Sequence, residues 1–136
     1  MTAALIFKIC NFLVFPQWIL MIVAPKWKVT QELINWRIIP FVLALVYAFY
    51  ALTNLGQSEG NFNSLEGVMT LFSNDLNVLT GWIHYLAFDL LIGGWVLKTA
   101  QKKGIHHGLV IPCLLGCFML GPIGFGVFWL ICKFRE

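Results

Sequence analysis

The sequence predicts an all-α membrane protein, a bundle of four transmembrane helices forming one domain over residues 1–136. Hydrophobic residues make up 60% of the chain and charged residues only 11%, whereas soluble domains average about 45–50% apolar and about 25% charged. The apolar residues also gather into four stretches that approach the ~20 residues a helix needs to cross ~30 Å of hydrocarbon. A soluble globule of this size would expose enough apolar surface to aggregate.

The four predicted spans follow one another along the chain. Each runs through an apolar stretch, and their ranges are about 3–24, 38–55, 79–97 and 109–132. The first span lacks the basic start and the small-residue cleavage site of a signal peptide, so we expect it to be retained. The connection between the second and third spans is the longest. Its residues 64–72 form a candidate amphipathic helix lying on the bilayer.

The basic residues indicate which way such a bundle faces. With four spans, the first and third connections lie on one side of the membrane and carry Lys26, Lys28, Arg37, Lys98, Lys102 and Lys103. The other side holds both termini and carries only Lys8, Lys133 and Arg135. Lysine and arginine are enriched in cytoplasmic loops, so we expect both termini to face outward. The basic residues are too scattered for a nucleic-acid-binding patch.

The third span holds the residues best suited to chemistry. An ionisable side chain within a span is costly, so it usually faces the bundle interior and marks function. Asp89 lies about ten residues into this span, near the middle of the bilayer at 1.5 Å per residue. Hydrocarbon disfavours the charged carboxylate, so we expect a neutral carboxyl that can donate a proton. Trp82 and Tyr85 share the helical face of Asp89 and are candidate substrate-binding residues.

His84 is the second candidate catalytic residue, and helical geometry limits how it can act with Asp89. The two residues are five apart, about 140° around the helix axis. They can line one cavity only if that cavity wraps around the helix. The alternative for Asp89 is a structural role, as a hydrogen-bonding partner of Asn11 or Gln17 in the first span.

His106 and His107 form a pair at the start of the last span. They are candidate substrate-binding residues, and the alternative is that they cap the helix or lie at the membrane interface. The helix from His84 to Lys98 covers about 20 Å, whereas a metal–imidazole bond is about 2 Å long. One metal ion cannot bind His84 and this pair together, so we expect no metal centre.

Small residues recur through the last span. Cys113, Cys117 and Gly121 are spaced four apart, which lets another backbone approach closely, so a packing role is predicted for them. Pro122 and Gly124 add to this pattern and predict a kink. The chain contains no phosphate loop, dinucleotide fingerprint or CxxC pair, and the sequence therefore predicts no cofactor.

Several stretches resemble the abscisic-acid-deficient-4-like family. The most specific block is GWIHYLAFDL at 81–90, followed by GIHH at 104–107 and GPIG at 121–124. Weaker similarity covers 15–27 and 65–72, so the resemblance extends over nearly the whole chain. The family includes a plant plastid protein required for neoxanthin formation.

The resemblance implies a four-helix membrane protein that acts on carotenoids. The plant reaction converts an epoxide of violaxanthin into the allene of neoxanthin without net redox change. It needs a proton donor at the epoxide oxygen and a base for a polyene proton, and the resemblance assigns these roles to His84 and Asp89. The implied partners are membrane lipid, an apolar carotenoid or isoprenoid substrate, and a second copy of the chain or a partner carotenoid enzyme.

One position departs from the family pattern. Relatives are expected to carry arginine where this chain has Gly94, which leaves the substrate open. The chain shows no transit-peptide-like extension, which favours a bacterial inner membrane over a plastid. Two other functions also stay open. One is a non-catalytic scaffold that binds carotenoid or lipid, and the other is a small proton-coupled transporter that uses Asp89.

Overall fold

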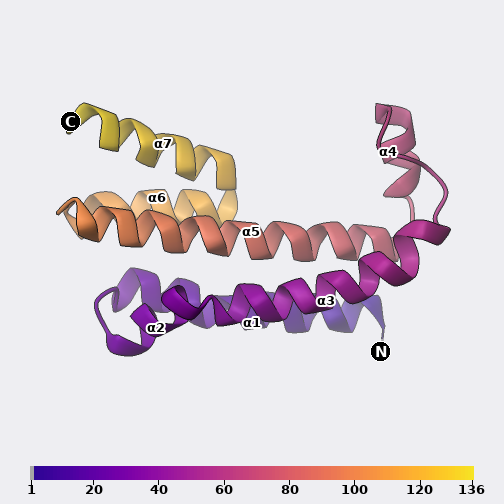
Figure 1. Cartoon of the computed structure of the whole chain (residues 1–136), viewed down its shortest axis with the longest axis horizontal. Coiled ribbons are helices and arrows are strands. Elements are labelled where there is room, and N and C mark those ends of the chain that lie inside the picture. The colour runs from indigo at the N-terminus through magenta and orange to yellow at the C-terminus, as the bar shows by residue number, and fades with distance from the viewer. Residues whose placement is uncertain (1) are drawn as a thin grey trace.

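The computed structural model describes residues 2–136, which form helices joined by turns, with no strand among them. The first half contains α1 (Ala3–Val23), α2 (Lys28–Trp36), α3 (Ile38–Asn54) and the short 3₁₀ helix η1 (Leu55–Gln57). The second half contains α4 (Leu65–Leu71), α5 (Asp75–Lys102), α6 (His107–Met119) and α7 (Gly121–Phe134). The longest helix, α5, runs through the middle of the molecule (Figure 1).

The core forms where α5 packs against α1, α3 and α6. Trp18 of α1 lies directly over Gly93 of α5, where an added Cβ would stand only 2.5 Å from the indole ring. The same indole meets the ring of Phe118 of α6 edge-on, with centroids 5.4 Å apart. One large aromatic side chain thus joins three helices, and the glycine makes room for it.

Three helical segments are long and apolar enough to cross a membrane: α1, the stretch from Lys28 to Gln57, and α5. The predicted second span, 38–55, falls on α3, and the predicted third span, 79–97, lies within α5. α5 extends beyond that prediction because Asn74 caps its first turn, its side-chain oxygen accepting a 2.8 Å hydrogen bond from the backbone N–H of Leu76. The expected short helix in the long connection is α4.

The prediction of one span over 109–132 is not confirmed. The chain forms two shorter helices there, α6 with 13 residues and α7 with 14. They are about 20 and 21 Å long, less than the ~30 Å of a hydrocarbon core. The break falls at Leu120, whose backbone leaves the helical region at φ −144° and ψ 72°. Pro122 favours a break here because it lacks an N–H and crowds the preceding turn.

The two short helices fold back on each other as a hairpin, seen above α5 in Figure 1. The predicted placement of both termini on one side is likewise not supported. The N-terminus lies at one end of the molecule and the C-terminus at the other (Figure 1). At the C-terminal end, Glu136 accepts a 3.3 Å hydrogen bond from Lys103, which follows α5.

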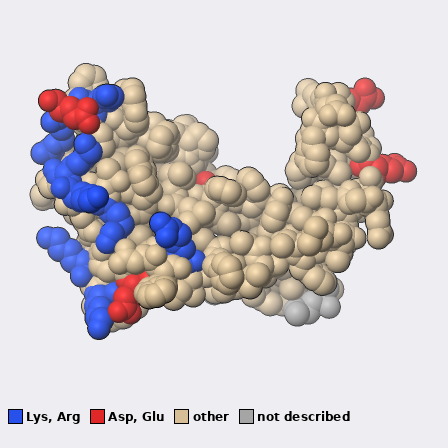
Figure 2. Space-filling view, viewed as in Figure 1, with Lys and Arg blue, Asp and Glu red and all other residues tan. Residues whose placement is uncertain are grey.

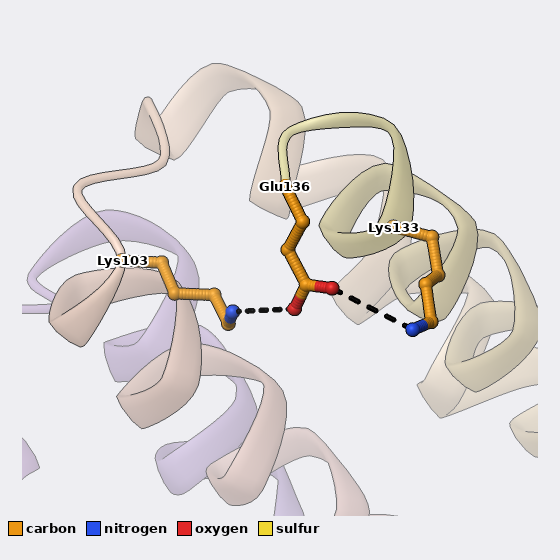
Figure 3. A network of polar contacts seen from close by, with 3 residues as sticks. All are labelled: Lys103, Lys133 and Glu136. Atoms are coloured by element: carbon orange, nitrogen blue, oxygen red, sulfur yellow. Dashed lines mark hydrogen bonds and ion pairs between the residues drawn. The ribbon is translucent and has the colours of Figure 1, made fainter.

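The hairpin adds Lys133 and Arg135 to the basic residues around α2 and the end of α5, so that nearly all basic residues lie at one end of the molecule, which we call the basic end (Figure 2). Every lysine and arginine except Lys8 belongs to it: Lys26, Lys28, Arg37, Lys98, Lys102, Lys103, Lys133 and Arg135. Glu136 bridges Lys103 and Lys133 there, with N–O distances of 3.3 and 3.5 Å (Figure 3). The hydrogen bond from Lys103 and the charge of Lys133 lower the pKa of the Glu136 carboxyl.

Candidate functional site

Two polar residues of α5 meet the turn between α6 and α7. Tyr85 and Asp89 are one helical turn apart and point to the same side of α5. The Tyr85 hydroxyl donates a 2.8 Å hydrogen bond to the backbone carbonyl of Met119, at the end of α6. The Asp89 carboxyl lies against Gly121, the first residue of α7. The contact is so close that a Cβ added to this glycine would collide with Oδ1 of Asp89.

The polarity of each group matches the helix end that it faces. The last carbonyls of a helix lack intrahelical donors and carry partial negative charge, whereas the first N–H groups carry partial positive charge. The Tyr85 donor faces the end of α6, and the Asp89 acceptor faces the start of α7. One oxygen of Asp89, Oδ2, is buried without a hydrogen-bond partner in the described part of the chain. The site therefore presents one free carboxyl oxygen beside a phenol.

Aromatic rings extend from this pair along α5 and α1. The ring of Trp82 stacks on Tyr85 at 5.2 Å, and Phe7 of α1 lies 5.4 Å from Trp82. The indole N–H of Trp82 donates a 3.0 Å hydrogen bond to Asn11 of α1. Asn11 was one of the two residues expected as a hydrogen-bonding partner of Asp89, and it bonds to Trp82 instead. The second, Gln17, lines a separate cavity that is bordered by Arg37 and Lys98.

The α6–α7 hairpin and α4 cover different parts of α5 and leave a hollow between them, visible in Figure 2. Phe72, next to α4, lies on Gly81, where an added Cβ would stand 2.8 Å from its ring. The hairpin first meets α5 at Tyr85. Between these contacts the side chain of Trp82 remains 37% exposed.

His84 lies on a different face of α5 from Asp89. Its ring packs between Tyr47 of α3, at 5.8 Å, and Phe88, at 4.8 Å. It lines a mostly apolar cavity of about 300 Å³ that is also bordered by Asn77. The structure therefore does not bring the two predicted catalytic residues to one cavity, and a single substrate atom cannot meet both.

His106 and His107 take part in local hydrogen bonds at the start of α6. The ring nitrogen Nδ1 of His106 accepts a 3.0 Å hydrogen bond from the backbone N–H of Gly108, and so caps the helix. His107 Nε2 lies 2.7 Å from the carbonyl of Ile22, in the last turn of α1. Both imidazole rings thus lie within hydrogen-bond distance of backbone groups at helix ends, and both residues are distant from His84 in the sequence.

The small residues of the last predicted span lie at the contact between α6 and α7. Cys113 and Cys117 are buried. Gly124 of α7 approaches the backbone of α6 so closely that an added Cβ would collide with Cys117, and Gly116 stands opposite it. Gly121 faces Asp89 instead, and Pro122 is exposed in the first turn of α7. The close approach is therefore made within one chain, between the two halves of the stretch that was expected to form one kinked span.

Two further polar groups are buried, and the sequence indicated only one of them, Gln17, as a possible partner of Asp89. Gln17 and Asn77 are each 1% exposed, and each has a side-chain oxygen without a hydrogen-bond partner in the described part of the chain. A polar residue within an apolar span is the only pattern that could have marked them. Within residues 2–136, no group of three or more histidine, cysteine, aspartate or glutamate side chains is placed to hold a metal ion.

The fold and the site define a class of protein. It is a helical protein with three membrane-length helices, a helical hairpin beside the longest of them, and a buried carboxyl group at the tip of that hairpin. The chain belongs to the ABA DEFICIENT 4-like family, whose sequence pattern it matches over residues 5–128.

One relative is the Arabidopsis thaliana protein named Protein ABA DEFICIENT 4, chloroplastic. It is 26% identical to this chain over an alignment of 132 positions, which covers 90% of this chain. The match covers 58% of the length of the Arabidopsis protein. No solved structure matches the chain.

Proposed function

We propose that this protein is a membrane isomerase of a carotenoid or related isoprenoid, in which Asp89 moves the protons and Tyr85 helps to position the reacting groups. The observation that supports this proposal is the buried Oδ2 of Asp89, which has no hydrogen-bond partner among the described residues and belongs to a carboxyl on the same helical face as the Tyr85 phenol. Buried polar atoms are normally hydrogen-bonded, and the exceptions call for an explanation such as a catalytic role. A substrate oxygen would supply the missing partner.

The aromatic rings fit an extended apolar substrate. Phe7, Trp82 and Tyr85 form a continuous row that ends at Asp89. Aromatic side chains bury large apolar areas and pack well against flat conjugated systems. A polyene lying along this row would bring its polar end group to the carboxyl.

The chemistry of an epoxide-to-allene isomerisation requires only proton transfers. The Asp89 carboxyl donates a proton to the epoxide oxygen as the carbon–oxygen bond breaks, which leaves a hydroxyl and a carbocation. A polyene carbon then loses a proton to the carboxylate, forming the new double bond and restoring the acid. The Tyr85 hydroxyl orients the carboxyl or the substrate oxygen. One carboxyl thus serves as acid and then as base, and His84 has no proton to transfer at this site.

The test is the pigment profile of a carotenoid-producing host that expresses each variant at equal membrane abundance. Asp89→Asn keeps the shape of the side chain but cannot supply a carboxyl proton. It should lower product formation by about 10²–10⁴-fold, as expected for loss of a general acid. Tyr85→Phe should lower it less. His84→Gln is the matched control on the same helix and should retain the product.

The outcomes separate the proposed mechanism from its rivals. Equal loss in Asp89→Asn and His84→Gln would favour the paired mechanism implied by the family resemblance. A product that survives every substitution would overturn the acid–base mechanism and favour a carotenoid-binding scaffold, in which Tyr85 and Asp89 only hold the hairpin in place. Proton-coupled flux that disappears in Asp89→Asn while pigments stay unchanged would indicate a transporter.

A further inference from the structure

A second polar cavity lies toward the basic end, away from Asp89. It has a volume of about 250 Å³ and is enclosed by α1, by the junction of α2 and α3, and by α5. Its polar residues include Gln17 of α1, Arg37 at the junction and Lys98 of α5. The proposed isomerase site uses none of these residues.

The cavity carries uncompensated positive charge. Arg37 and Lys98 both line it, and no acidic side chain does so within the described chain. Lys98 Nζ donates a 2.6 Å hydrogen bond to the side-chain oxygen of Gln31, which leaves two of its three donors free. The Arg37 guanidinium has one long hydrogen bond, 3.4 Å, to the carbonyl of Asn35. Both cations therefore have donors available for an anion.

The first turn of α3 adds donors on the same side. Arg37 stands between α2 and α3 in a left-handed conformation, with φ 51° and ψ 39°. Its side chain does not cap α3. The backbone N–H groups of Ile38 and Ile39 are therefore available to an anion, whereas Pro40 has no N–H to offer. Arg37 and Pro40, in the first turn, both line the cavity.

Gln17 is an independent indication that something binds there. Its side chain is 1% exposed and lines the cavity. Its Oε1 has no hydrogen-bond partner in residues 2–136. A buried amide without partners is unfavourable, and a ligand hydroxyl or a protonated phosphate oxygen would satisfy it.

The rest of the wall is apolar and lies deeper in the molecule. Leu90, Leu91 and Trp95 line the cavity from α5, on the side of Lys98 that leads away from the basic end. From Lys98 to Leu90 the helix covers about 12 Å. The cavity is thus cationic at one end and apolar at the other, as a molecule with an anionic head and a hydrocarbon tail requires.

We propose that this cavity binds the phosphate group of an amphiphile, with the phosphate between Arg37 and Lys98 and the hydrocarbon chain along Leu91 and Trp95. The molecule is an amphiphile whose head carries net negative charge, either an anionic bilayer glycerophospholipid or a phosphorylated isoprenoid, since both present the same head and tail chemistry. Free phosphate lacks the tail and would leave the apolar wall empty.

The experiment is native mass spectrometry of the purified full chain, released from detergent after incubation with one probe at a time. The probes are dioleoyl phosphatidylglycerol, dioleoyl phosphatidylcholine, geranylgeranyl phosphate and inorganic phosphate. We expect retention of phosphatidylglycerol or geranylgeranyl phosphate, whichever is the natural source, and much weaker retention of phosphatidylcholine. Equal retention of all three amphiphiles, or binding of inorganic phosphate that displaces them, would overturn the proposal.

Variants locate the site. Arg37→Gln with Lys98→Gln should weaken retention of the anionic amphiphile roughly tenfold or more, because charge-assisted hydrogen bonds are lost. The matched control is Lys28→Gln with Lys102→Gln, which removes equal charge from exposed positions at the same end and should bind as the original chain does. Equal loss in both double variants would show a general charge effect and overturn the site.

Replacing Lys98 also removes its hydrogen bond to Gln31. A third variant therefore tests the cavity at a position that makes no such bond. Leu91→Trp narrows the cavity from its half-buried apolar wall and changes no charge. It should reduce retention of the amphiphile while the thermal stability of the protein without lipid stays close to that of the original chain. Unchanged retention in Leu91→Trp would place the bound lipid elsewhere.

Discussion

The first and last apolar stretches of this protein have similar composition but fold differently. The first, α1, keeps Pro16 in its middle and remains one helix of 21 residues. The last, over 109–132, breaks at Leu120 and folds back on itself. α1 contains no glycine, whereas the last stretch contains several, including Gly116 and Gly124 at the closest contact between its halves. Proline alone therefore does not decide whether an apolar segment spans.

What makes the break stable is the set of partners available to the exposed backbone. In hydrocarbon, each free N–H and carbonyl must find a partner within the protein. Tyr85 donates to the carbonyl of Met119, and Asp89 stands at the start of α7. The hairpin thus depends on small residues inside it and on a polar pair in the neighbouring helix.

The largest expected effect concerns topology, because a hairpin and a span place the C-terminus on opposite sides. In a background without the native cysteines, single cysteines are introduced at Glu59, Lys102 and Arg135 and labelled with a membrane-impermeant maleimide. Cysteines at Lys102 and Arg135 should label from one side, and that at Glu59 from the other. The positive-inside rule predicts that the basic side is cytoplasmic.

The control for this experiment is the cysteine-free background itself, which must match the thermal stability of the original chain because Cys113 and Cys117 are buried. Labelling of Arg135 from the same side as Glu59 would show that 109–132 spans the membrane and would refute the hairpin.

A smaller but measurable effect is expected at the glycine contact. A leucine at Gly124 would meet the backbone of α6 at Cys117, Gly116 and Cys113, which cannot move aside as a flexible side chain could. Gly124→Leu should lower the free energy of unfolding in detergent by at least the ~1–3 kcal/mol typical of overpacking. Gly126→Leu is the matched control, since nothing lies within 4 Å of its Cβ position. Equal stability of the two variants would mean that α7 separates from α6 in solution.

The smallest effect concerns the ion pairs that fix the end of the hairpin. The pKa of Glu136 is lowered from its ordinary value of 4.5 by Lys103 and Lys133. Because folding lowers the pKa of this carboxyl, the ion pairs stabilise the folded protein at pH values above the ordinary pKa. This stabilisation is lost as the pH falls through the lowered pKa. Glu136→Gln should therefore reduce thermal stability slightly at neutral pH and at low salt. The difference should vanish in acid or in high salt, and a difference that persists there would exclude this ion pair as its source.

The sequence alone was sufficient to predict the helices that consist of long apolar stretches. The spans expected over 3–24, 38–55 and 79–97 correspond to α1, α3 and the central part of α5, because an apolar run of that length has few alternatives. The shared face of Tyr85 and Asp89 followed from helical geometry alone. The family resemblance was confirmed over residues 5–128.

The remaining features depend on contacts between segments. Hydropathy counts residues 109–132 as one run because it does not register the close approach of Gly124 to α6. The break in this one segment also changes the side on which Lys133 and Arg135 are expected. The cavity at Gln17 could not be predicted either, since its walls come from α1, the junction at Arg37 and α5. Such features depend on how helices are placed rather than on what each helix contains.

The hairpin has a consequence for how the chain enters a membrane during synthesis. Lys133 and Arg135 end on the side from which α6 starts, so neither has to be translocated through the hydrocarbon. Each such residue costs about 2.5–3.5 kcal/mol at the centre of an inserting helix. A hairpin can enter from one side and stop, whereas a fourth span would have to carry its charged tail across. The last stretch can therefore insert after the other helices are in place, without drawing its charged end through the bilayer.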